Sequence, residues 1–277
     1  LRELGTVERE GVRYSVSVRP GTRGLLNAEV HFTSGETDLS FTGFKPLVLG
    51  LPLAKHQVLC PLIAIQEESG NGYRVRHSFR SSLGTFDLVG ELRIDEGALK
   101  VQFQLENAPA PTPWQVVSLD DLAAGPWNSE LQRVYAGQGN ILVNQKAFSL
   151  EFDGHRLSTS YVGFDFANGI SILQASDVPP DRLEVTPDSH VATLHVPDTQ
   201  TVCYVPAKSS WEAALVYRDI DKRQAAGGVP RAAGRFVFDL WGGTFAEQTE
   251  NLKRAFQYGL TDAMVVWHNW QHWGYDY

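Results

Sequence analysis

The segment from Trp267 to Asp276 concentrates side chains that could bind a sugar. It reads Trp-His-Asn-Trp-Gln-His-Trp-Gly-Tyr-Asp and holds three of the chain's seven tryptophans and two of its eight histidines. The C–H face of a pyranose packs on an aromatic ring, while amide, imidazole and carboxylate groups form hydrogen bonds with the hydroxyls. We therefore predict a carbohydrate-binding site made by Trp267, His268, Trp270, Gln271, Trp273, Tyr275 and Asp276.

Two other interpretations of this segment stay open. Aromatic side chains at a domain junction can simply pack two domains together. His268 and His272 have the i, i+4 spacing of metal ligands on a helix. However, the segment has the pattern of a strand and a loop, and no general-base glutamate stands between the two histidines. We expect no metal site and no cofactor.

The elements before this segment form a predicted βαβ unit. Residues 235–240 favour a strand, and a Trp-Gly-Gly turn follows it. Thr244 as N-cap, with Glu247 three residues later, is a capping box that predicts a helix over 245–258, with Gly259 at its end. The apolar run over 263–267 predicts a second strand, buried on both faces of a parallel sheet.

This βαβ unit explains why the segment could be functional. Ligands of parallel α/β domains bind beyond the C-terminal ends of the strands, where residues 239–243 and 267–276 lie. Asp239 is the other chemical candidate there, although a hydrogen bond to the following turn is its plainer role. A lone βαβ unit leaves apolar strand edges uncovered, so we expect the parent protein to continue beyond Tyr277.

Residues 1–228 have a different pattern, the period-2 alternation of half-buried strands. Apolar and polar residues alternate over 12–19, 28–33, 99–105 and 148–152, and turn signals such as Pro20-Gly21 separate the runs. The apolar face of each strand needs a second sheet to cover it. We predict a mainly β fold, a large two-sheet antiparallel super-sandwich of roughly 14 to 18 strands. We expect one helical interruption, near residues 129–135.

Composition excludes some partners. The formal charge of −8 and a pI near 5.5 argue against a nucleic-acid surface, which is normally basic. No apolar run approaches the roughly 20 residues that span a bilayer, so we expect no membrane partner. Cys60 and Cys203 are the only cysteines, and two interpretations stay open: a pair of buried thiols, or one disulfide.

A family resemblance appears in the same segment. Trp270-Gln271-His272-Trp273-Gly274-Tyr275-Asp276 resembles the aromatic/Gln…Gly-His-Asp loop of the endo-α-N-acetylgalactosaminidases, which are bacterial glycoside hydrolases. Tyr275 stands where that family has His. The layout of the whole chain resembles the wider group of α-glycosidases in which a galactose-mutarotase-like super-sandwich precedes a (β/α)₈ barrel.

The resemblance carries several implications. Residues 1–228 would be the super-sandwich, and residues 229–277 the beginning of a catalytic (β/α)₈ barrel of TIM type, here truncated. Asp276 and its neighbours would line a sugar subsite at the barrel mouth. The catalytic carboxylates of a retaining α-glycosidase would lie beyond Tyr277, packed in the rest of the barrel, and this fragment would be inactive. An extracellular or periplasmic location would follow.

Two further function classes stay open. A non-catalytic carbohydrate-binding sandwich would need an exposed aromatic platform, which Trp114, Trp127 or Trp211 could supply. An aldose mutarotase would need a base and an acid that face each other across a groove. The sandwich histidines are scattered in the sequence with no evident glutamate partner: His31, His77, His155, His190 and His195.

Overall fold

The structure is a computed structural model that divides into two compact units, Leu1–Asp221 and Lys222–Tyr277. It describes residues 1–277 except for 21–27, 43–47, 52–53, 59–62, 82–83, 108–114, 119–121, 125–126, 137–140, 144–145, 152–160, 178, 181, 190, 196–200, 223, 225 and 269–277. None of the described helices is both long and apolar enough to cross a membrane.

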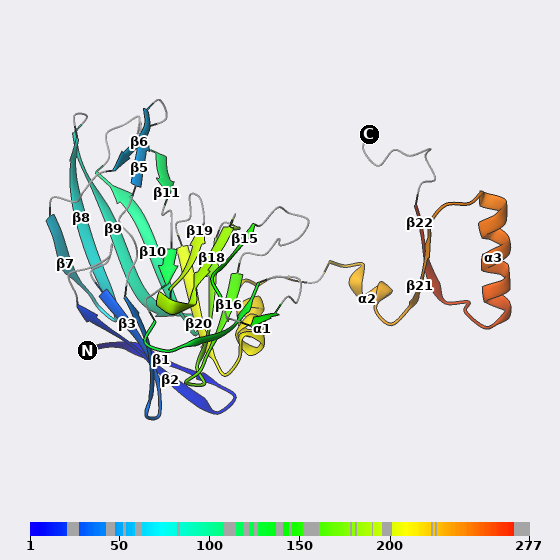
Figure 1. Cartoon of the computed structure of the whole chain (residues 1–277), viewed down its shortest axis with the longest axis horizontal. Helices are drawn as coiled ribbons and strands as arrows, with labels where there is room; N and C mark the ends of the chain where they lie inside the picture. The colour runs from blue at the N-terminus through cyan, green and yellow to red at the C-terminus, as the bar shows by residue number, and fades with distance from the viewer. Residues whose placement is uncertain are drawn as a thin grey trace. The chain divides into compact units, whose positions relative to one another are not determined.

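The first unit is built from antiparallel sheets, the largest of which has nine strands among the described residues (Figure 1). Its order is β14 (Ile141–Val143), β13 (Leu131–Tyr135), β16 (Tyr161–Phe166), β17 (Ser171–Ser176), β20 (Thr201–Ala207), β10 (Ala98–Glu106), β9 (Gly84–Asp95), β8 (Gly72–Ser81) and β7 (Ile63–Ser69).

Three smaller sheets complete this unit. The first has the order β1 (Arg2–Arg9), β2 (Val12–Pro20), β3 (Ala28–Ser34) and β4 (Thr37–Thr42). The second has the order β12 (Leu122–Ala124), β19 (Val191–His195), β18 (Arg182–Thr186) and β15 (Phe148–Glu151), with the 3-10 helix η1 (Pro187–Ser189) between β18 and β19. The third has the order β11 (Gln115–Ser118), β5 (Val48–Leu51) and β6 (Ala54–Val58).

One hydrophobic core joins the large sheet to two of the smaller ones. Side chains from β2 and β3, such as Val16 and Phe32, lie in one cluster with Phe164 of β16, Tyr204 of β20 and Leu183 of β18. This arrangement confirms an antiparallel β-sandwich. The second layer is divided between separate sheets, and the described strands of this unit run from β1 to β20, more than expected because several have only three to five residues.

The expected helix near residues 129–135 is wrong, because this segment is β13. Leu131 and Val134 are both buried, and their i, i+3 spacing imitates a helical face. A register shift between Leu131 and Arg133, where β13 pairs with β16, inserts an extra residue. Such a bulge lets two residues three apart point to the same side of a strand.

A helix that the sequence analysis missed, α1 (Ser210–Ile220), covers the outer face of the large sheet (Figure 1). Its Ala213 packs in a second, smaller cluster with Leu173 and Ala175 of β17 and Val205 of β20. Gly163 of β16 permits the close approach, since a Cβ at that position would lie 2.5 Å from the Cβ of Ser210. The start of α1 is therefore held against the sheet.

The second unit contains the predicted βαβ arrangement. After the short α2 (Val229–Ala232) come β21 (Phe236–Leu240), α3 (Phe245–Gln257) and β22 (Ala263–Trp267), and the two strands are parallel. Both hydrogen bonds of the Thr244–Glu247 capping box are present, and Gly259 has a φ of +87°, the left-handed conformation that favours glycine after a helix.

The burial expected for the second strand is not met within this unit. Val265 and Val266 of β22 are 44% and 38% exposed, and Phe236 and Val237 of β21 are 51% and 47% exposed. The physical reason is that each strand has only one neighbouring strand in the described two-stranded sheet. A single long helix, α3, connects the two strands.

We expect the buried His77 of β8 to make stability depend on pH. The side chain is 2% exposed, and neither ring nitrogen has a hydrogen-bond partner among the described residues. Burial lowers the pKa of His77 from 6.5 to about 4. The unfolded chain therefore binds a proton that the folded chain does not, so this contribution to stability is lost as pH falls from about 6.5 to about 4.

The test compares the native chain with His77→Gln by urea unfolding at two pH values. Between about pH 7 and pH 5.5, the native chain should lose about 1 kcal/mol more unfolding free energy than the variant. His77→Gln is neutral at both values, so other titrating groups cancel in the difference. Equal pH dependence in the two proteins would contradict a buried, neutral His77.

Candidate functional site

The parallel register of β21 and β22 brings two distant parts of the chain together at the C-terminal ends of these strands. Asp239 lies opposite Val266, and Leu240 opposite Trp267. One step further, the backbone N–H of His268 donates to the carbonyl of Leu240 over 2.9 Å. The side chains that follow each strand are therefore placed side by side, where α/β domains bind ligands.

Three of these side chains form what we call the strand-end cluster: Asp239, Trp241 and His268. The indole Nε1 of Trp241 donates to Asp239 Oδ2 over 2.9 Å. His268 Nε2 lies 2.5 Å from Asp239 Oδ1. The Trp241 and His268 rings stack with their centroids 3.7 Å apart and their planes 9° from parallel. Each member thus contacts both of the others.

The cluster combines a charged acceptor with an open aromatic surface. The hydrogen bond from Trp241, followed by that from His268, holds the pKa of Asp239 below its ordinary value. Asp239 is therefore ionised at neutral pH and accepts hydrogen bonds. Trp241 is 60% exposed. An exposed indole beside a carboxylate and an imidazole is the combination that binds a sugar ring and its hydroxyls.

The structure locates two of the seven sequence-predicted contact residues. His268 belongs to the strand-end cluster, whereas the ring of Trp267 lies 4.3 Å from that of Phe245, at the start of α3. The other five residues, Trp270, Gln271, Trp273, Tyr275 and Asp276, lie outside the described residues. Asp239 does form a hydrogen bond with the turn that follows β21, as predicted. Its partner in that turn is Trp241, a member of the strand-end cluster.

Trp241 is the member that sequence reasoning missed. The sequence feature that could have identified it is an aromatic residue two positions after an acidic one, at the end of a predicted strand. As for metals, the described residues contain no group of three His, Cys, Asp or Glu side chains placed to hold an ion. His272, the second member of the candidate metal pair, lies outside the described residues.

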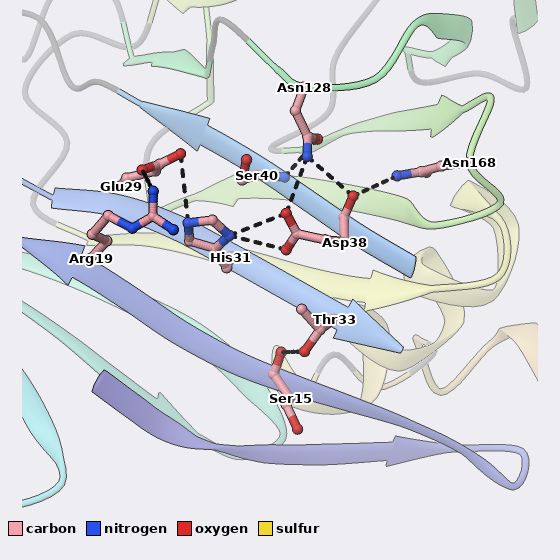
Figure 2. Close-up of polar contacts among 9 residues, drawn as sticks. All are labelled: Ser15, Arg19, Glu29, His31, Thr33, Asp38, Ser40, Asn128 and Asn168. Atoms are coloured by element: carbon pink, nitrogen blue, oxygen red, sulfur yellow. Dashed lines mark hydrogen bonds and ion pairs between the residues drawn. The ribbon is translucent and has the colours of Figure 1, made fainter. Parts of the chain in front are cut away.

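The sandwich contains a histidine–carboxylate contact that the sequence did not reveal (Figure 2). His31 Nδ1 lies 3.0 Å from Asp38 Oδ1, and His31 Nε2 lies 3.6 Å from Glu29 Oε1. Asn128 and Asn168 also donate to the backbone carbonyl of Asp38. Because His31 is only 5% exposed, this network ties β3 and β4 to the loops before β13 and after β16, and a sugar has little access to the ring.

The exposed fractions of their side chains distinguish the remaining candidate residues of the sandwich. Trp127 is 2% exposed and belongs to the core, so it is not a platform, while Trp211 is 62% exposed. Cys203 is a buried free thiol whose pKa burial raises to about 12. Trp114, His155, His190 and Cys60 lie outside the described residues, and so does the His195 side chain.

Comparison with known proteins gives a likeness of fold. The chain aligns with the α-N-acetylgalactosaminidase NagBb from Bifidobacterium bifidum in its complex with Gal-NHAc-DNJ, with a TM-score of 0.61, 13% identity, and coverage of 98% of this chain and 52% of that one. The GalNAc complex of NagBb gives a TM-score of 0.60 with the same identity and coverage. A GH36 α-galactosidase, AgaA from Geobacillus stearothermophilus, gives 0.46 at 8% identity, over 90% and 48% of the two chains.

No family model and no curated protein sequence matches the chain. These structural neighbours are glycoside hydrolases, and at 13% identity the resemblance is distant and concerns the fold alone. The chain spans about half the length of NagBb.

Proposed function

We propose that this chain is the N-terminal portion of a carbohydrate-active enzyme, a retaining α-glycosidase that acts on glycans. Residues 1–228 would be the super-sandwich, and residues 229–277 the first βαβ unit of a catalytic (β/α)₈ barrel. The observation that carries the proposal is the strand-end cluster, in which an ionised Asp239 is hydrogen-bonded to both Trp241 and His268. The fold likeness to an α-N-acetylgalactosaminidase supports it, as do the exposed apolar side chains of β21 and β22.

In this proposal the strand-end cluster is part of a sugar subsite. Trp241 offers its ring to the C–H face of a pyranose. Asp239 accepts a hydrogen bond from a hydroxyl, and His268 and Trp241 hold the carboxylate in position. Trp270, Gln271, Trp273, Tyr275 and Asp276 would extend the subsite, as would Trp267.

The catalytic pair would lie in the part of the parent protein outside this chain. A retaining glycosidase needs two carboxyl groups about 5 to 5.5 Å apart. In the described part of the second unit, Glu247 caps α3, Glu250 pairs with Lys253 over 2.7 Å and Asp262 pairs with Arg235 over 3.3 Å. Among the described residues of the second unit, Asp239 is therefore the one carboxylate at the strand ends. A retaining mechanism needs two.

The experiment compares the 277-residue chain with the longer parent protein on aryl α-N-acetylgalactosaminides and α-galactosides. We expect no turnover above background by the chain alone and turnover by the parent, because the oxocarbenium-like transition state needs both carboxyl groups. Turnover by the isolated chain that disappears in Asp239→Asn would place the catalytic pair inside this fragment. A parent protein that is inactive on every glycoside tested would contradict the proposed glycosidase function.

A further inference from the structure

The sandwich has a surface cavity far along the sequence from the strand-end cluster. The cavity has a volume of about 380 Å³ and lies where β13, β16 and β17 meet the first turn of α1. Arg133 and Tyr135 of β13, Lys208 before α1, and Trp211 in the first turn of α1 contribute to its lining. We call it the α1 cavity.

Asp165 of β16 fixes one side of the α1 cavity. Its Oδ1 accepts hydrogen bonds from the backbone N–H of Ser210 over 2.8 Å, from Ser210 Oγ over 2.7 Å and from Ser171 Oγ over 2.7 Å. These bonds anchor the first turn of α1, at the place where Gly163 permits its close approach. The start of α1, which precedes Trp211 directly, is thereby held against β16.

The charged residues that line the α1 cavity are two cations, Arg133 and Lys208, and one anion, Asp165, although the whole chain carries −8. The three donors engage Oδ1 of Asp165, and Oδ2 lies 3.7 Å from Arg133 Nε. The Arg133 side chain is 54% exposed. The Lys208 side chain makes no ion pair with any described residue, and the Lys208 backbone N–H donates to Glu212 Oε2 over 3.3 Å.

An aromatic surface accompanies these two cations. Trp211 is 62% exposed, an unusual state for so large an apolar side chain. Tyr135 is half-buried and stacks on Tyr161, with centroids 6.4 Å apart and planes 13° from parallel. One open indole and two cations around a cavity of this size fit a ring with an apolar face and an anionic substituent.

We propose that the α1 cavity binds an acidic saccharide, a pyranose that bears a carboxylate or a sulfate ester. The sugar ring packs on Trp211, and the anionic group is bound by Arg133 and Lys208. Gln132 and Ser209, which also line the cavity, offer polar groups to neutral hydroxyls. This site lies in the sandwich, so it does not depend on whether residues 229–277 begin a barrel.

The test titrates the full chain with sialyllactose, sulfated lactose, lactose and inorganic sulfate, by calorimetry and tryptophan fluorescence. We expect the acidic saccharides to bind, and lactose to bind about ten-fold more weakly or not at all, because it lacks the charge-assisted hydrogen bonds. Whichever acidic saccharide binds more tightly identifies the group, carboxylate or sulfate, that the cavity prefers.

Variants separate the two contributions. Trp211→Ala should weaken both acidic saccharides about ten-fold or more, and the Arg133→Gln/Lys208→Gln double variant should abolish the preference over lactose. Arg218→Gln removes an exposed cation from the far end of the same helix and should change nothing. Arg133, Lys208 and Trp211 belong to the first unit and the strand-end cluster to the second, so failure here is distinguishable from failure of the proposed glycosidase function.

Three results would overturn the proposal. The first is binding of lactose as tight as that of the acidic saccharides, and the second is the absence of binding by all of them. The third is binding of inorganic sulfate as tight as that of sulfated lactose with no effect of Trp211→Ala, which would indicate an anion site without sugar contact. Melting temperatures of the variants, which change exposed residues, should stay close to that of the native chain.

Discussion

Replacing Trp127 by alanine is expected to lower the free energy of unfolding of the sandwich by about 3–5 kcal/mol, the range for truncating a large buried aromatic. Trp127 is 2% exposed, and its ring centroid lies 4.6 Å from that of Phe41 and 4.7 Å from that of Phe166. It also forms a β-bridge with Phe41. The residue thus joins β4 to β16 through the core, and no neighbouring side chain can refill its volume without rearrangement.

The measurement is urea unfolding followed by circular dichroism. Trp211→Ala is the matched control, because the same substitution at a 62% exposed position should change the free energy of unfolding by no more than about 0.5 kcal/mol. Equal effects of the two substitutions would mean that Trp127 does not pack between the two sheets as described.

In the full-length parent protein, Asp239→Ala is expected to lower kcat/KM by about ten-fold or more, the scale of one lost charge-assisted hydrogen bond. The substitution removes the acceptor of both Trp241 and His268, so the stacked rings lose the group that positions them. The melting temperature should change little, because the Asp239 side chain is 54% exposed.

Asp262→Ala is the control for this experiment. It removes an exposed carboxylate at the opposite end of the βαβ unit, where Asp262 pairs with Arg235 over 3.3 Å. Its kcat/KM should match that of the native protein. Unchanged kinetics in Asp239→Ala, together with a large fall in melting temperature, would make the strand-end cluster a structural contact rather than a subsite.

The same assay extends to the segment after β22. Asp276→Ala is expected to lower kcat/KM on the same scale if that carboxylate contacts the sugar. Trp270→Ala and Trp273→Ala distinguish binding from packing. A stacking residue would lose affinity while stability is retained, whereas a residue that packs two domains together would cost about 3–5 kcal/mol of stability.

Local sequence patterns predicted local structure well. The alternation over residues 12–19, 28–33 and 99–105 corresponds to β2, β3 and β10. The capping box at Thr244 and Glu247 places the start of α3. Ser209 and Glu212 carried the same N-cap spacing before α1, and Ser209 does accept from the N–H of Glu212. That helix could have been found by the argument that found α3.

Features that depend on how strands pair were not predicted correctly from the sequence. Leu131 and Val134 have helical spacing, and only the bulge against β16 explains how a strand buries both. His31 also appeared isolated along the chain. Its contact with Asp38 exists because β3 and β4 pair in a particular register, with His31 opposite Ser40 and Thr33 opposite Asp38.

The sequence by itself determined the two kinds of structure in this chain, because alternation and capping act between residues a few positions apart. It also predicted a sugar site at the polar, aromatic strand ends, and that site stays a prediction. Only the tertiary structure decided which side chains meet there. Asp239 contacts His268 across 29 positions of sequence through the parallel register of β21 and β22, and Arg133 reaches the α1 cavity because β13 pairs with β16. Such contacts depend on how strands are paired and where a helix packs, and neither leaves a periodic signal in the sequence.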